Sequence, residues 1–166
     1  TLSLLWLWCG VVEFIVFFGS VNTQYYMWGG IWIIQAVLFF IFGFKLKKTA
    51  FKFENSINGY LGLILIMYAL IIYPILGYFA GHGYPYGPVF GVAPCPVCIF
   101  TFGALLMIRV KIPYYILIVP FLWGLLGIAA VLMLGVYADA GEVIAAILGT
   151  ILILRRNKGL KILNTQ

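Results

Sequence analysis

The sequence predicts an all-α membrane protein, a single bundle of about six transmembrane helices. Of its 166 residues, 65% are hydrophobic and only 8% are charged. A soluble domain is typically about half apolar and about a quarter charged, so this composition excludes that class. The apolar residues form long runs, and the basic residues fall only in alternate connections between those runs. Both patterns are typical of a polytopic helical membrane protein.

Six apolar runs are candidate spans, because a helix needs about 20 apolar residues to cross the hydrocarbon core. The fourth run is the shortest, and its length is also compatible with a tilted or re-entrant helix. The runs lie at Leu2–Gly19, Tyr26–Phe44, Ile57–Ala80, Pro96–Ile108, Tyr114–Gly135 and Ala140–Leu154.

The basic residues predict the orientation of these spans. All ten Lys and Arg residues follow the second, fourth or sixth run, and the other connections have none. Because Lys and Arg favour the cytoplasmic side, this division predicts six crossings with Thr1 and Gln166 both on the cytoplasmic side. Without a fourth crossing, Arg109 and Lys111 would lie on the wrong side. Such short basic loops suit lipid headgroups and offer no surface for nucleic acid.

The connection from Gly81 to Cys95, called the lid below, is expected on the outer face. It is dense in Gly and Pro, which excludes a regular helix or strand. It is also apolar and aromatic, which is unusual for a solvated loop. We therefore expect a compact segment folded against the ends of the helices.

The lid ends in a cysteine pair, Cys95-Pro96-Val97-Cys98. Pro96 suits the first position of a helix, which would place Cys95 at the N-cap and Cys98 in the first turn. The helix N-terminus favours a thiolate there. Three interpretations are open: structural packing or a structural disulfide, a reversible thiol–disulfide pair, and a soft-metal site completed by His82. The only other cysteine is Cys9, so a second redox pair is absent from this sequence.

Two polar side chains are expected inside the membrane. Glu13 lies within the first run and Gln35 in the middle of the second, so we expect them to be partners. A carboxyl at this depth is protonated and hydrogen-bonded between helices, or it belongs to a proton or ion pathway. Asp139 and Glu142, in contrast, have the spacing of a capping box at the start of the last helix.

Short motifs resemble those of an uncharacterised bacterial family of multi-pass membrane proteins, the family with domain of unknown function 6064. The resemblance is clearest in the lid and the helix after it, and it covers most of the chain. The residues that carry it are Trp8, Gly10, Gln35-Ala36, Tyr73-Pro74, Gly81-His82-Gly83-Tyr84-Pro85, Pro88, Phe90-Gly91-Val92, Pro94-Cys95-Pro96, Ile99-Phe100-Thr101-Phe102-Gly103 and Tyr137-Ala138-Asp139.

The resemblance implies a bacterial inner-membrane protein without an established activity. Members of the family usually have Thr at the position of Cys98, and aromatic and His side chains near Glu13 and Phe14, so thiol–disulfide chemistry is not implied for the family. They also tend to have an additional N-terminal span. Since the sequence starts at Thr1 within an apolar run, we expect residues before it.

The preferred function from sequence is a non-enzymatic accessory or structural subunit of a membrane complex. No nucleotide-binding, metalloprotease or hydrolase motif is present, and no internal repeat suggests a transporter. No cofactor is indicated. The alternatives are a thiol–disulfide carrier that uses Cys95 and Cys98, and binding or transport of a soft metal (copper, zinc or mercury) through Cys95, Cys98 and His82.

Overall fold

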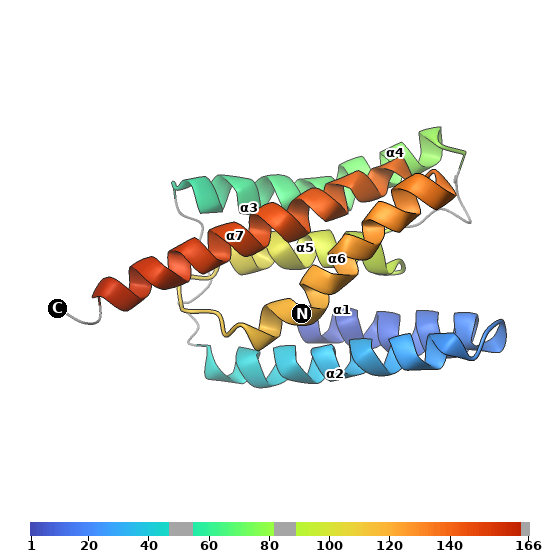
Figure 1. Cartoon of the computed structure of the whole chain (residues 1–166), viewed down its shortest axis with the longest axis horizontal. Helices are drawn as coiled ribbons and strands as arrows, with labels where there is room; N and C mark the ends of the chain where they lie inside the picture. Colours follow the sequence, from blue (N-terminus) through green and yellow to red (C-terminus); the bar gives the residue numbers. More distant parts are fainter. Residues whose placement is uncertain (47–54, 82–88, 164–166) are drawn as a thin grey trace.

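The protein is a bundle of long helices, seen here in a computed structural model that describes residues 1–46, 55–81 and 89–163 (Figure 1). Within these residues no strand is present, which confirms the predicted all-α class. Five helical stretches of the described chain are long and apolar enough to cross a membrane: Leu2–Ser20, Gln24–Lys45, Ile57–Phe79, Tyr115–Met133 and Tyr137–Leu160.

Several of these stretches contain more than one kind of helix. The first consists of α1 (Leu2–Trp8), the π-helix η1 (Cys9–Phe17) and the 3-10 turn η2 (Phe18–Ser20). The third consists of α3 (Ile57–Met67), the π-helical turn η4 (Tyr68–Ile72) and α4 (Tyr73–Phe79). The remaining elements are α2 (Gln24–Lys45), α5 (Pro94–Leu106), α6 (Tyr115–Leu134), η5 (Tyr137–Asp139) and α7 (Ala140–Leu163).

The short helix α5 lies in the middle of the bundle rather than at its edge, between α3 and α7 (Figure 1). Nearly all its side chains are buried, including Val97, Ile99, Phe102 and Leu105, which are 0% exposed. Its 13 residues give a length of about 20 Å, which is less than the roughly 30 Å of the hydrocarbon core. The neighbouring helices therefore surround a helix that is too short to cross the hydrocarbon core by itself.

Polar side chains of α7 form hydrogen bonds with the backbone at the end of α5 and in the connection after it. Arg156 donates hydrogen bonds to the carbonyl oxygens of Leu105 and Leu106, at 3.2 and 3.0 Å. Asn157 accepts from the N–H of Ile112 at 3.1 Å and donates to its carbonyl oxygen at 2.7 Å. The last span was expected to end at Leu154, but α7 continues through these residues to Leu163.

Glycines allow the helices of the bundle to approach closely. A Cβ atom at Gly62 of α3 would lie 2.8 Å from the carbonyl oxygen of Gly103 in α5. A Cβ atom at Gly103 would likewise lie 2.8 Å from the carbonyl oxygen of Gly62. Gly124 of α6 likewise lies close to Ala146 of α7. Small residues at such contacts are typical of membrane helices.

An aromatic cluster joins α1, α2 and α6. Trp6 and Trp32 stack with ring centroids 3.9 Å apart, and Trp123 meets Trp32 edge-on at 5.0 Å. The indole N–H of Trp6 donates to the hydroxyl of Thr101 in α5 at 2.9 Å. Trp123 also contacts Trp28 edge-on, with ring centroids 5.6 Å apart.

The described Lys and Arg residues gather at one end of the bundle. They lie at the end of α2, in the connection from α5 to α6, and in the last turns of α7, which meet at the left in Figure 1. The helices alternate in direction between the two ends, as the pattern of charges predicts. The count of six crossings and the side of the membrane to which each end belongs stay predictions.

Candidate metal centre

Three potential ligands meet at the end of the bundle opposite to the basic residues: Cys95, Asp139 and Glu142. The sulfur of Cys95 and one carboxylate oxygen of each acid all lie within 4.8 Å of one another. Asp139 and Glu142 are 2% and 1% exposed, and Cys95 is half-buried. In the described part of the chain, this is the group of Cys, His, Asp and Glu side chains close enough together to hold a metal ion.

Two helix starts bring these residues together. Cys95 is the second residue of α5, which begins at Pro94 after the turn at Val89–Ala93. The chain leaves α6 at Gly135, whose φ of 68° favours glycine, and passes through η5 into α7. Asp139 therefore ends η5, and Glu142 lies in the first turn of α7.

Tyr73, at the start of α4, holds one of the carboxylates in place. Its hydroxyl donates a hydrogen bond to Oδ1 of Asp139 at 2.5 Å, and the Tyr73 side chain is 1% exposed. Tyr68, in η4, donates to the main-chain carbonyl of Ala138 at 2.9 Å. The third helical stretch thus fixes the turn that carries Asp139.

Glu142 is the most unusual of the three groups. Both of its carboxyl oxygens are buried, and neither has a hydrogen-bond partner among the described residues. The described Lys and Arg side chains lie at the other end of the bundle, so none of them balances its charge. A buried carboxyl in such surroundings is neutralised by a proton or by a bound cation, because an isolated buried charge is very costly.

The structure changes the set of residues predicted at the cysteine pair. Helix α5 starts two residues earlier than expected, so Cys95 is not its N-cap and Cys98 lies beyond the first turn. Cys98 is 0% exposed, and its thiol donates to the carbonyl oxygen of Pro120 at 3.3 Å. All three cysteines are free thiols. His82 and most of the lid lie outside the described residues.

The interpretation of Asp139 and Glu142 as a capping box was wrong. Helix α7 does begin directly after Asp139, as a capping residue requires. However, the Asp139 carboxylate accepts from Tyr73, and the Glu142 carboxyl makes no bond back to the chain among the described residues. The side chains point into the cluster with Cys95 instead.

Glu13 and Gln35 are not partners, contrary to the prediction. Gln35 is 0% exposed and donates to the carbonyl oxygen of Ile116 in α6 at 3.0 Å. That carbonyl is available because Pro120, four residues later, has no N–H to donate to it. Glu13 lies in the π-helix η1, and its Oε2 has no hydrogen-bond partner in the described chain.

Replacing Gln35 with Leu is expected to destabilise the bundle, because the buried carbonyl of Ile116 then loses its donor. A buried group without its partner costs about 1–3 kcal/mol. The midpoint of thermal unfolding in detergent should fall for Gln35→Leu and stay nearly constant for Gln24→Leu, at the exposed start of α2. Equal midpoints for the two variants would show that this hydrogen bond contributes little.

Sequence reasoning missed Tyr73 and the role of both acids in this cluster. A signal was present in the motifs, because Tyr73-Pro74, Pro94-Cys95-Pro96 and Tyr137-Ala138-Asp139 each contribute one residue to it. Nothing in the order of the chain indicates that these three segments meet. Only the fold supplies that proximity.

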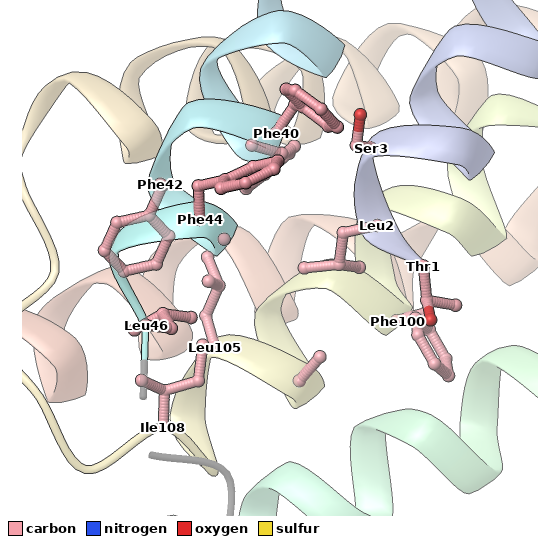
Figure 2. Close-up of a pocket in the computed structure, with 13 residues that line it drawn as sticks. Thr1, Leu2, Ser3, Phe40, Phe42, Phe44, Leu46, Phe100, Leu105 and Ile108 are labelled. Carbon is pink, nitrogen blue, oxygen red and sulfur yellow. The ribbon is translucent and has the colours of Figure 1, made fainter. Parts of the chain in front are cut away.

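A cavity of about 760 Å³ lies elsewhere in the described part of the protein (Figure 2). It is bounded by the start of α1, the end of α2 and one side of α5, and phenylalanines such as Phe40 and Phe44 line it. Its walls contain no Cys, His, Asp or Glu among the described residues. The cluster at Cys95 is therefore the better candidate for chemistry.

Comparison with known proteins identifies the family of this chain. The model of the family of unknown function DUF6064 matches residues 1–162. The chain belongs to this family. Comparisons with curated proteins and with solved structures gave no match. Membership in DUF6064 confirms the resemblance found in the motifs and supplies no activity, so the function has to be argued from the site.

Proposed function

We propose that this membrane protein binds a divalent transition-metal ion, of the zinc type, through Cys95, Asp139 and Glu142. The observation that carries the proposal is the convergence of three ligand atoms within 4.8 Å at a buried place. A cluster of acidic residues alone would not indicate a metal site. The second observation is Glu142, which is 1% exposed and has no hydrogen-bond partner within the described chain for either carboxyl oxygen, one of which lies in the cluster.

The types of ligand fit a borderline metal. Zinc takes thiolate, imidazole and carboxylate ligands, whereas magnesium and calcium prefer oxygen alone. Ligand atoms around a tetrahedral zinc ion lie about 3.3–3.8 Å apart, so side-chain shifts of about 1 Å would close this cluster on the ion. A divalent cation would also offset most of the negative charge of two carboxylates and the Cys95 thiolate, which lowers the cost of burying them.

Tyr73 would act as a positioning residue. Ligands of a metal are usually oriented by hydrogen bonds from residues behind them, and losing such a bond typically lowers metal affinity about 10–100-fold. The hydroxyl of Tyr73 makes this kind of bond to Asp139. Three protein ligands leave one coordination position for water or another molecule, as in catalytic rather than structural zinc sites.

Metal analysis of the purified full chain tests the proposal. After equilibration with zinc and removal of the excess, we expect about one zinc per chain, as the site has room for one ion. Cys95→Ser and Glu142→Gln should abolish tight binding, and Tyr73→Phe should weaken it about 10–100-fold. Cys9→Ser is the matched control, because Cys9 lies in η1 and is not part of the cluster.

No saturable zinc binding, or equal binding by wild type and Glu142→Gln, would contradict the proposal. A folded wild-type protein without metal affinity would leave the accessory-subunit interpretation as the one to pursue. A thiol–disulfide carrier would instead require that Cys95 and Cys98 form a reversible bond. Alkylation in intact membranes with and without a reductant, followed by mass measurement, separates that alternative.

A further inference from the structure

A second cavity of about 330 Å³ lies directly beside the cluster. Its walls come mainly from α6, through Trp123, Leu126, Ala130 and Met133, and they are almost entirely apolar. The lining side chains that carry polar atoms are Cys95, Glu142 and the indole of Trp123. An apolar chamber with a few convergent polar groups is the usual form of a site for a small molecule.

The cavity opens toward the apolar outer surface of the bundle. Leu126 and Met133, which line it, are 44% and 81% exposed. On a helix that crosses a membrane, such side chains face lipid. This position would allow a molecule dissolved in the bilayer to enter the cavity laterally, without passing through water.

Glycine allows the carboxyl of Glu142 to reach this cavity. A Cβ atom at Gly127 of α6 would lie 3.0 Å from Oε2 of Glu142, so a larger residue would displace the carboxyl group. Both oxygens of that group lack a hydrogen-bond partner in the described chain. A carboxyl group accepts a hydrogen bond through its carbonyl oxygen even when it is protonated, so a donor can be its partner in either state.

We propose that this cavity binds a membrane-soluble aromatic alcohol with its hydroxyl on Glu142. An apolar cavity of about 150 Å³ holds one benzene ring, so the volume here suits a head of about two fused rings. Trp123 offers an aromatic surface for such a head. The hydroxyl donates to Glu142 in the metal-free protein, and its oxygen would be a further ligand if the proposed zinc ion were bound.

Binding of two matched probes to the full-length protein in lipid nanodiscs tests the inference. The probes are 2-naphthol and 2-methoxynaphthalene, which differ in the ability to donate a hydrogen bond. With a chelator present, 2-naphthol should bind saturably, above its uptake by empty discs, and about 10-fold or more tightly than the ether. Glu142→Leu should remove this preference, and Ala130→Phe should abolish binding of both probes by filling the cavity.

Ile128→Phe is the control for Ala130→Phe, since Ile128 is an exposed neighbour on the same helix that does not line the cavity. It should bind both probes normally. Equal affinity for the two probes, a preference that survives Glu142→Leu, or binding that survives Ala130→Phe would each overturn the inference. Because the chelated protein is used, the inference can hold when zinc binding fails, and zinc binding can hold when the inference fails.

Discussion

Gly103→Ala is expected to destabilise the bundle by about 1–3 kcal/mol, because overpacking a well-packed contact costs about that much. The added Cβ would lie 2.8 Å from the carbonyl oxygen of Gly62 and 2.9 Å from Cγ1 of Ile66. The first of these is a backbone atom, so α3 and α5 would have to move apart. In a chain of this size, the loss would lower the midpoint of thermal unfolding by roughly 2–4 °C per kcal/mol.

Gly30→Ala is the matched control and should change stability in the opposite direction. Gly30 also lies inside a helix, α2, but a Cβ there would meet nothing within 4 Å. Alanine is favoured over glycine in a helix by about 1 kcal/mol. If both variants shift the unfolding midpoint equally, the contact between Gly62 and Gly103 is not a determinant of the fold.

Asn157→Leu should have an effect at least as large. The variant removes both hydrogen bonds of the Asn157 side chain to Ile112, which is 0% exposed. Since each buried group left without a partner costs about 1–3 kcal/mol, the expected loss is about 2–6 kcal/mol. The connection from α5 to α6 should then become accessible, which limited proteolysis and the unfolding midpoint would both detect.

Asn157→Asp separates the two bonds, because aspartate still accepts from the N–H of Ile112 and can no longer donate to its carbonyl oxygen. We expect a loss of stability for this variant too. Asn22→Leu, on the exposed turn before α2, should cost far less although it also removes a side-chain bond to the backbone. Comparable losses at Asn157 and Asn22 would contradict the role assigned to the buried pair of bonds.

The class of the fold could be predicted because a membrane leaves few alternatives. Every backbone polar group in the hydrocarbon must be satisfied within the chain, so long apolar runs without strand patterns become helices. The ends were harder to predict. Helix α7 passes Leu154 into a charged segment, which from sequence alone has the composition of a loop.

The place of α5 in the bundle could not be read from its length. A run of 13 apolar residues indicates a weak span, and the structure makes it the central helix. The reason lies in its partners. Its close contact with α3 depends on Gly62 and Gly103, and the hydrogen bonds at its end come from Arg156. From sequence alone, none of these residues can be assigned to such a contact.

The candidate site was half predictable. Cys95 was identified from its position at the end of the lid. The other two residues of the cluster, Asp139 and Glu142, come from a segment about 45 residues later, and their spacing in the sequence equally suits a helix cap. The distinction depends on which hydrogen bonds the acids make. The Asp139 carboxylate accepts a hydrogen bond from the hydroxyl of Tyr73, and the carboxyl of Glu142 lies near Cys95 and beside the cavity.

The contacts of α5 also set an order of events during biosynthesis. The carbonyl oxygens at its end receive their donors from Arg156, about 50 residues later in the chain. When the ribosome has made α5, those donors do not yet exist. The centre of the bundle therefore reaches its final hydrogen bonding only after the last helix has been synthesised, and folding cannot finish one hairpin at a time.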